Sequence, residues 1–185
     1  MTTLQHTTMS DVDRYLWNSS KLHRSYRKLG AHLCNIDGLR GVHFAVWAPN
    51  AEAVHLMASF NGWSRTATPM QHFDRDTGIW SAFRPGVPEG ASYKYCITAR
   101  NGGLVAKSDP YAFQGELRPS NASVIYDLHR YQWGDEHWLA LRKEARPLEA
   151  PLAIYEAHLG SWLRNLDNSW MTYRELAPRL IEHLS

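Results

Sequence analysis

The sequence predicts a mainly β protein built around an antiparallel sandwich, and three observations carry this prediction. Residues 41–63 contain two short runs in which apolar side chains alternate with others, a period of two that is typical of strands. Asn61-Gly62 follows the second run and tolerates positive φ, as a tight turn requires. Further short runs, bounded by Gly, Pro or Asn, recur as far as residue 127. This spacing is typical of an immunoglobulin-like sandwich.

Residues 1–36 are predicted to form a short helical lead-in to the sandwich. Ser10 or Asp11 can cap its first helix, and Gly30 can end the helical segment. The first residues are polar and lack the charged start and apolar core of a secretory signal peptide.

The sandwich itself is expected over residues 37–127, with its first strand beginning near Gly41. Residues 42–46 alternate in that strand, which predicts one buried and one exposed face. Trp63 falls just past the Asn-Gly turn, where a large aromatic side chain is expected to be half exposed. The later runs expected as strands are 79–84, 93–97 and 122–127.

The pattern changes after residue 127. Residues 128–150 are predicted to form a connector that contains a helix, with Asp135 as its N-cap. Residues 151–185 are expected to form a new unit, which begins with a strand over 154–162. From Thr172 onward apolar residues recur at the spacing i, i+3, i+4, which predicts an amphipathic helix.

Composition narrows the classes of function. The net charge of +2 gives no reason to expect a nucleic acid or an anionic membrane as partner. No apolar run approaches the length of a membrane span. Cys34 and Cys96 are far apart and are expected to be reduced thiols, which favours a cytoplasmic location. His43 and His55 have no Cys or carboxylate at ligand spacing, so no metal site is expected.

Longer motifs add a resemblance to a known family. Phe-Ala-Val-Trp-Ala-Pro-Asn-Ala at 44–51 and Phe-Asn-Gly-Trp at 60–63 resemble the start of the glucan-binding sandwich called carbohydrate-binding module family 48. That module precedes the barrel in branching and debranching enzymes of glycoside hydrolase family 13. Ile-Tyr-Glu-Ala-His-Leu-Gly-Ser-Trp at 154–162, followed by Tyr-Arg-Glu-Leu-Ala at 173–177, resembles the first strand and helix of the barrel in 1,4-α-glucan branching enzymes.

The resemblance implies that residues 151–185 are the start of a truncated (β/α)8 barrel. A full branching enzyme transfers an α-1,4-glucan chain to a 6-hydroxyl and uses no cofactor. The carboxylates that carry out this chemistry lie at the ends of later barrel strands in the family, and no residue here matches their motifs. No catalytic residue is therefore assigned, and this chain alone is expected to be inactive. Glu156 and His158 are interpreted as a polar layer inside the barrel.

The resemblance also implies sugar-contacting residues on the sandwich. In glucan-binding members of the module family, a Trp after the Phe-Asn-x turn stacks on glucose and a Lys in Tyr-Lys-Tyr hydrogen-bonds its hydroxyls. These positions match Trp63 and Lys94. An Asn near the last strand corresponds to Asn121, and Trp80 is a further aromatic residue that reaches either the same surface or the core. A second stacking Trp is absent, and residues 101–104 stand in its place.

Three alternatives remain open. The chain is a free-standing glucan-targeting module, or a sandwich used only for protein interactions, which a buried Trp63 would favour. The third alternative is the N-terminal part of a related debranching enzyme or trehalohydrolase. The expected partners are an α-glucan, weakly bound, and the missing catalytic barrel of the same enzyme.

Overall fold

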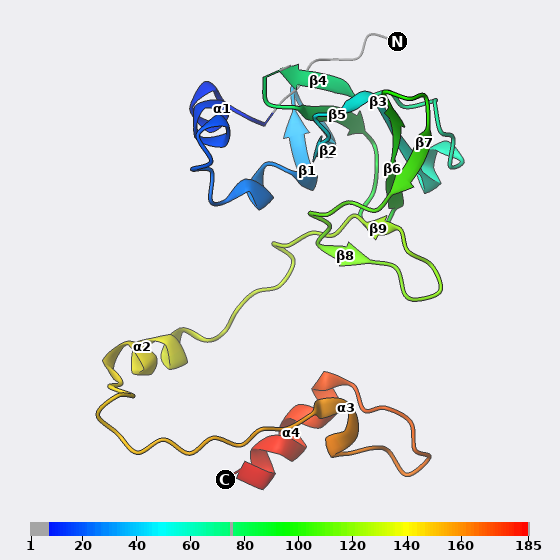
Figure 1. Cartoon of the computed structure of the whole chain (residues 1–185). Helices are drawn as coiled ribbons and strands as arrows, with labels where there is room; N and C mark the ends of the chain where they lie inside the picture. The colour runs from blue at the N-terminus through cyan, green and yellow to red at the C-terminus, as the bar shows by residue number, and fades with distance from the viewer. Residues whose placement is uncertain (1–7, 75, 185) are drawn as a thin grey trace. The chain divides into compact units, whose positions relative to one another are not determined.

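The computed structural model describes residues 8–74 and 76–184, and the chain divides into two compact units, 1–132 and 133–185 (Figure 1). The expectations for the first seven residues lie outside the described residues. Each unit is described below by itself.

The first unit contains two antiparallel sheets. One has the strand order β1-β2-β5-β4, and the other has the order β3-β6-β9-β8, with β7 also paired to β6. The first sheet consists of β1 (Gly30–Ile36), β2 (Leu39–Trp47), β4 (Gln71–Asp74) and β5 (Ile79–Pro85). The second consists of β3 (Ala51–Ala58), β6 (Ser92–Ala99), β7 (Leu104–Lys107), β8 (Gln114–Gly115) and β9 (Ser123–Val124). The prediction of a mainly β, antiparallel architecture is confirmed.

Side chains from both sheets fill one core. Phe44 of β2 meets Tyr93 of β6 edge to face, with ring centroids 5.1 Å apart. The Tyr95 hydroxyl oxygen also lies 3.4 Å from the carbonyl oxygen of Ala45 in the other sheet. The other buried residues of this core include Val42, Val46, Val54, Leu56, Ala58, Trp80, Ala82 and Ile125. They occupy alternate positions along their strands, as the period of two predicts.

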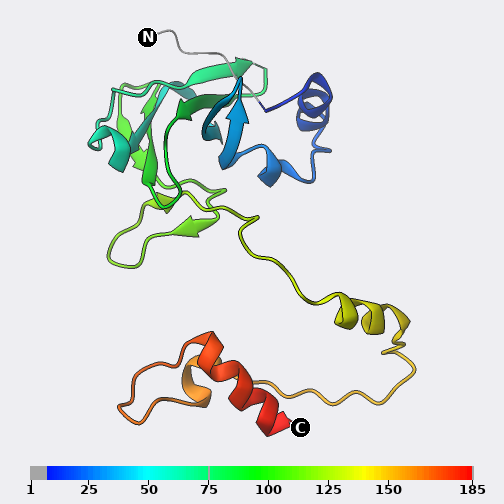
Figure 2. The same cartoon turned by 180° about the vertical axis from the view of Figure 1, so that it is seen from behind.

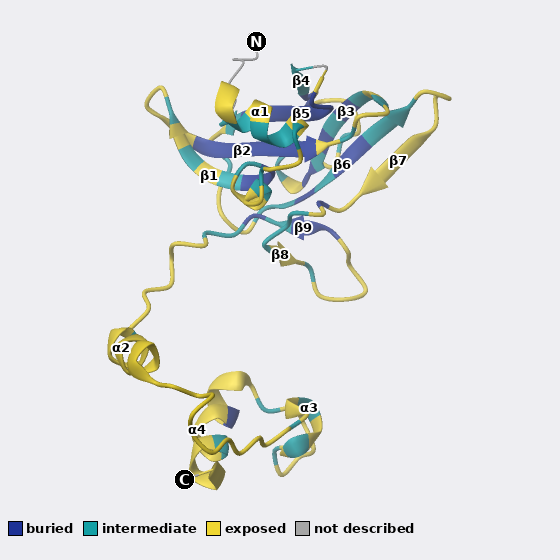
Figure 3. Cartoon of the chain, turned by 60° about the vertical axis from the view of Figure 1, so that its left-hand side comes forward, coloured by how far each residue is buried: buried dark blue, intermediate teal, exposed yellow. Residues whose placement is uncertain are grey.

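β2 is buried on both faces, which corrects the expectation of one exposed face (Figure 3). His43 and Ala45 alternate with the residues of the sandwich core, yet their exposed fractions are 0% and 1%. A second apolar cluster covers this face. Its buried members are Met9, Leu29, Ala45 and Ile79, with Trp17 and Leu22 packed against them. The lead-in supplies much of this cover, so the alternation in the sequence identifies only the face that points into the sandwich.

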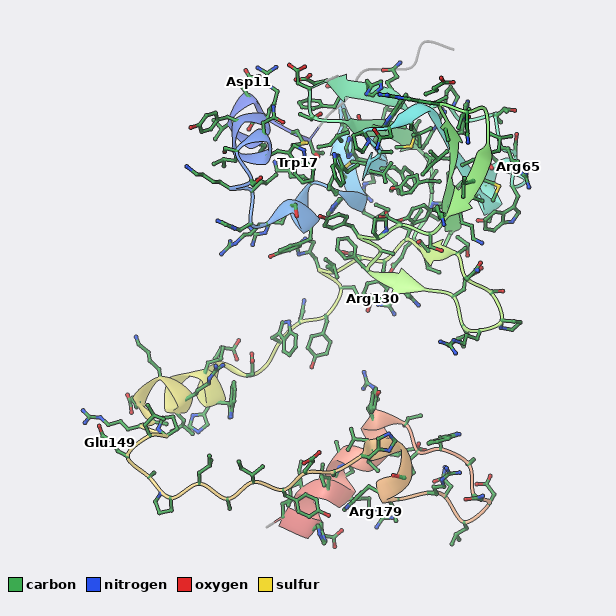
Figure 4. All side chains as sticks on the ribbon, in the orientation of Figure 1. Asp11, Trp17, Arg65, Arg130, Glu149 and Arg179 are labelled. Atoms are coloured by element: carbon green, nitrogen blue, oxygen red, sulfur yellow. The ribbon has the colours of Figure 1, made fainter. Side chains whose placement is uncertain are left out.

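The lead-in begins with α1 (Asp11–Asn18), which lies beside the first sheet (Figures 1 and 2). Ser10 is its N-cap, because the Ser10 hydroxyl accepts a hydrogen bond from the Asp13 N–H at 3.2 Å. The Asp13 carboxylate accepts one from the Ser10 N–H at 2.9 Å, which completes a capping box. Trp17 points toward the sheet (Figure 4), and its indole N–H donates to the Thr77 carbonyl at 3.2 Å.

The helical segment ends earlier than predicted, and the first strand begins at Gly30 rather than near Gly41. After the short 3₁₀ turn η1 (Ser25–Arg27) the chain enters β1 directly. Gly30 has φ +100°, and a Cβ there would lie 2.9 Å from the Tyr111 carbonyl oxygen. Glycine is therefore needed here because two backbone segments approach closely, and not because a helix ends at this residue. β1 is an edge strand that pairs only with β2 among the described residues. Polar side chains are tolerated there, so the sequence carries little apolar alternation to identify it.

The free edge of β3 is covered by the segment that follows Trp63. The Leu56 N–H donates to the Thr68 carbonyl, and the Met70 N–H donates to the Val54 carbonyl, both over 2.8 Å. Pro69, which has no N–H of its own, bridges to His55 between these two bonds. The backbone groups of β3 that face away from β6 are therefore largely paired inside the same unit.

The second unit contains α2 (Glu136–Glu144), α3 (Leu159–Trp162) and α4 (Tyr173–Leu184). The helix predicted from Thr172 is confirmed. The Glu175 carboxylate accepts hydrogen bonds from the Thr172 N–H at 2.7 Å and from its hydroxyl at 2.8 Å. The helix predicted after Asp135 also forms, although the Asp135 side chain makes no cap hydrogen bond.

The strand predicted over 154–162 is wrong. Residues 151–158 have no regular structure, and the rest of the segment forms α3. A strand needs a neighbour that accepts and donates its backbone hydrogen bonds, and no described strand pairs with this segment. The apolar residues at the start of the segment do not by themselves form a strand. Glu156 and His158 do not share a strand face, so their interpretation as a polar barrel layer has no structural support here.

A buried carboxylate, Asp109, joins the second sheet to the loop after β7. Its Oδ2 atom accepts hydrogen bonds from the hydroxyls of Tyr93 at 2.6 Å and Tyr95 at 3.0 Å. Its Oδ1 atom accepts one from the Tyr111 N–H at 2.8 Å, and the Asp109 N–H donates to the Ser123 hydroxyl at 2.8 Å. Burial raises the pKa of the Asp109 carboxyl, and the hydrogen bonds from Tyr93, Tyr111 and Tyr95 oppose this rise.

We predict that Asp109→Ala lowers the free energy of unfolding by about 3 kcal/mol or more. The substitution leaves two buried hydroxyls and one N–H without their acceptor, and each such loss costs about 1–3 kcal/mol. Urea unfolding followed by tryptophan fluorescence measures the change. Asp76→Ala, which removes an exposed carboxylate, is the matched control and should change stability by less than about 0.5 kcal/mol.

The difference between wild type and Asp109→Ala should also depend on pH. Because the pKa of Asp109 is raised in the folded state, its contribution is fully present below the unfolded pKa, near pH 4, and decreases as pH rises through the folded pKa. The wild-type advantage should therefore be larger at pH 3.5 than at pH 8. An advantage that grows with pH would show that the hydrogen bonds outweigh burial at this carboxyl.

Candidate functional site

Lys94 and Asn121 are brought together on the outer face of the second sheet. Lys94 lies on β6 between the buried Tyr93 and Tyr95, so its side chain points to the opposite face. Its Nζ atom donates a hydrogen bond to the side-chain oxygen of Asn121. The Ser108 hydroxyl donates to the Asn121 carbonyl and fixes the backbone at this point. Two of the residues that the sequence selected are therefore in direct contact.

Trp63 follows the turn that ends β3. The Asn61 side chain builds this turn, because it accepts a hydrogen bond from the Ala58 N–H at 2.9 Å and donates one to the Leu56 carbonyl at 2.8 Å. Gly62 then takes φ +64°, and the Trp63 N–H donates back to the Ala58 carbonyl at 2.9 Å. The Trp63 side chain is 40% exposed, in agreement with the half exposure predicted from the sequence.

The backbone of Trp63 is itself left-handed, with φ +58°. A bulky residue in this region costs about 1–2 kcal/mol, and glycine or asparagine would occupy it with less strain. A strained position that carries an exposed aromatic ring is a feature of binding sites.

The strand register places Trp63 at the same end of the sheet as Lys94. Ala58 pairs with Tyr93, and Met57 pairs with Lys94. The Met57 side chain shares the outer face with Lys94, because residues directly opposite in neighbouring strands point to the same side. Lys94, Asn121 and Met57, together with Trp63 at the same end of the sheet, define what we call the Lys94 face. The sequence did not select Met57, since only the register of β3 against β6 reveals it.

Trp80 does not belong to the Lys94 face. It lies on β5 in the other sheet, its side chain is 6% exposed, and its indole N–H donates to the Ala48 carbonyl at 3.0 Å. Its ring packs against His72 with centroids 3.7 Å apart. Of the two positions that the sequence left open for Trp80, the structure shows the core.

Leu104 is the last of residues 101–104, which stand where the resemblance implies a second stacking tryptophan. It pairs with Thr98 at the start of β7 and is exposed. Thr98 lies four residues from Lys94 on β6, so Leu104 points to the outer face as well. The separation from Lys94 is on the order of 13 Å along the strand. An aliphatic side chain here adds apolar area but no flat ring.

The described residues, 8–74 and 76–184, contain no group of three His, Cys, Asp or Glu side chains arranged to hold a metal ion. Within the same part of the chain, no helix has the length and apolar character needed to cross a membrane. Cys34 on β1 and Cys96 on β6 are free thiols.

Comparison with known proteins gives a family match for the sandwich. Residues 28–112 match the family described as carbohydrate-binding module 48 (isoamylase N-terminal domain). This segment is a carbohydrate-binding module 48 domain. It includes Trp63 and Lys94 but not Asn121. The resemblance stated from the sequence is confirmed.

The chain is also similar to longer proteins. It is 42% identical over 193 residues to the 1,4-alpha-glucan branching enzyme GlgB of a Synechococcus species, which covers 95% of this chain and 25% of that enzyme. It is 47% identical over 178 residues to the 1,4-alpha-glucan branching enzyme GlgB of Gloeobacter violaceus, with 95% and 24% covered. The chain therefore spans about a quarter of the length of these relatives. Among solved structures, apo pullulanase from Klebsiella pneumoniae shows 31% identity and a TM-score of 0.44, over 54% of this chain and 11% of that one.

Proposed function

We propose that this chain is the N-terminal portion of a 1,4-alpha-glucan branching enzyme. The observation that carries the proposal is the 42% and 47% identity to two such enzymes across 95% of the chain, which includes the second unit as well as the sandwich. The full enzyme would transfer an α-1,4-glucan chain to a 6-hydroxyl. The catalytic carboxylates would come from the barrel of the same enzyme, because no residue of this chain matches their motifs.

The exposed side chains of the second unit support a barrel as the partner of this chain. Tyr173, Ile181 and Leu184 on α4 are exposed by 80%, 65% and 56%. Apolar side chains gathered on one helix are normally covered by other protein. We propose that residues 128–150 connect the sandwich to the start of this barrel. The two free thiols support the cytoplasm as its location.

We propose that the Lys94 face contacts an α-glucan. A lysine ammonium has three donors, and Asn121 uses one, so two remain for sugar hydroxyls. The exposed Trp63 ring offers a flat apolar surface on which a glucose ring can stack. Its exposure favours sugar contact over a sandwich used only for protein interactions, the alternative that required a buried Trp63. Because residues 101–104 contain no second tryptophan, we expect weak binding.

We predict that Trp63→Ala weakens the binding of maltoheptaose by about 5- to 150-fold. This range corresponds to about 1–3 kcal/mol, the amount that one stacked aromatic ring contributes at comparable surfaces. Isothermal titration or NMR titration of the full chain measures it. Trp138→Ala, which removes another exposed tryptophan, is the matched control and should bind as the wild type does. Equal affinity in wild type and Trp63→Ala would refute the assignment of Trp63.

We predict that Leu104→Trp strengthens maltoheptaose binding by about fivefold or more. The substitution places a second flat ring on the outer face of the sheet, at an exposed position where a larger side chain meets no core packing. Leu117→Trp, at another exposed leucine, is the control and should leave the affinity unchanged. An unchanged affinity in Leu104→Trp would separate the Lys94 face from the site at which the glucan binds.

We predict that the 185-residue chain alone has no branching activity. An iodine-stain assay on amylose tests this, because branching lowers the absorbance of the iodine complex. The purified GlgB of Gloeobacter violaceus serves as the positive control. A loss of absorbance that copurifies with the 185-residue chain would show that catalytic groups are present that the sequence motifs do not reveal.

A further inference from the structure

A second concave site lies on the first unit, formed by segments that are not part of the Lys94 face. It has a volume of about 550 Å³, within the range of small-molecule pockets. Its walls come from η1, from β1, from the loop before β8 and from the segment after β9. The lining residues are Tyr26, Arg27, His32, Phe113, Leu128 and His129. We call this site the Tyr26 pocket.

One wall of the Tyr26 pocket is fixed by contacts between η1, β1 and the loop before β8. The Ser25 and Tyr111 hydroxyls are hydrogen-bonded at 3.1 Å, which ties η1 to that loop. Gly30 allows the start of β1 to approach the Tyr111 backbone closely. The rings of His32 and Phe113 then meet edge to face, with centroids 5.2 Å apart. These contacts hold the aromatic wall in place without a ligand.

The opposite wall is fixed by the segment after β9. The Asp127 carboxylate accepts a hydrogen bond from the His129 N–H at 2.9 Å. The Asp127 N–H donates to Glu89 at 3.3 Å, and Arg130 pairs with Glu89 at 3.2 Å. Figure 4 shows Arg130 at this end of the sandwich. Because the contacts of both walls form without a ligand, binding would require little additional loss of conformational entropy in the pocket.

The groups that line the pocket have unused hydrogen-bonding capacity. In the part of the chain that the structure describes, the Tyr26 hydroxyl, the Arg27 guanidinium and the His129 ring have no hydrogen-bond partner. The Nε2 atom of His32 lies 2.9 Å from the Leu29 carbonyl, which only accepts, so Nε2 carries the proton and Nδ1 of the neutral ring is an acceptor. Tyr26 is also 44% exposed and presents an aromatic ring.

This combination matches the chemistry of a sugar. A hexose ring has an apolar face of C–H groups and a rim of hydroxyls that both donate and accept. Tyr26 and Phe113 suit the apolar face, while Arg27 donates and the two imidazoles accept or donate at the rim. Arg27 is the single Lys or Arg among the lining residues, so the pocket lacks the cluster of basic side chains that typically selects a phosphate.

We propose that the Tyr26 pocket binds a short neutral oligosaccharide, as a second saccharide contact separate from Trp63. The choice of an α-1,4-linked sugar as its probe rests on the proposed glucan function, whereas the saccharide class follows from the pocket itself.

NMR titration of the full chain with maltotriose tests the proposal residue by residue. We expect saturable shifts of the His32 and His129 signals, and these shifts should need at least fivefold more maltotriose in Tyr26→Ala and in Arg27→Met. Both side chains are exposed, so neither change threatens the fold. Tyr15→Ala removes an exposed tyrosine of α1 and should leave the shifts unchanged. Trp63→Ala should leave them within about twofold.

Two results would overturn the proposal. The first is the absence of saturable shifts at His32 and His129 up to the solubility limit of maltotriose. The second is the same shifts produced by inorganic phosphate alone, which would make the pocket an anion site. Failure of the Lys94 face would look different, because the signals of Lys94 and Met57 would stay unchanged while those of the pocket moved.

Discussion

The buried carboxylate of Asp109 is the constraint on which both candidate sites depend. It fixes Tyr93 and Tyr95 on the inner side of β6, and this orientation forces Lys94, between them, to the outer side. Its second oxygen fixes Tyr111, which holds one wall of the Tyr26 pocket through its backbone contact with Gly30. A charged group in a protein interior is costly unless it is hydrogen-bonded, and here two tyrosine hydroxyls and the Tyr111 N–H donate to the carboxylate.

The sandwich was predictable from the sequence because its core strands follow a simple rule. Where one face meets the core, apolar residues recur with a period of two, and β2, β3 and β6 all show it. The rule fails where strand formation depends on a neighbouring strand rather than on the apolar pattern of the segment itself. β1 is an edge strand with polar side chains, and residues 154–162 have an apolar start but no strand to pair with. The second buried face of β2 depends on Leu29 and Met9, which lie far from it in the sequence.

The two candidate sites differ in how far the sequence revealed them. Trp63, Lys94 and Asn121 were selected by resemblance to a family, and the hydrogen bond between Lys94 and Asn121 joins two of them. Nothing in composition or period selects the Tyr26 pocket, because its residues come from four segments and none of these is a motif. Tyr26 lies in a basic run that resembles an ordinary solvated surface. Only the folded arrangement of η1 beside Phe113 distinguishes it from such a surface.

The hydrogen bonds of residues 68–70 to the edge of β3 limit how another protein strand can pair with the sandwich. Val54 and Leu56 already exchange their outward hydrogen bonds with residues 68–70. The Leu56 N–H and the Val54 carbonyl are therefore not available to an extended segment from another molecule. The segment that covers β3 begins directly after Trp63. This tryptophan therefore lies next to a sheet edge that is already partly hydrogen-bonded within the same unit. At Val54 and Leu56, contact with another molecule would therefore have to come through side chains rather than through an added strand.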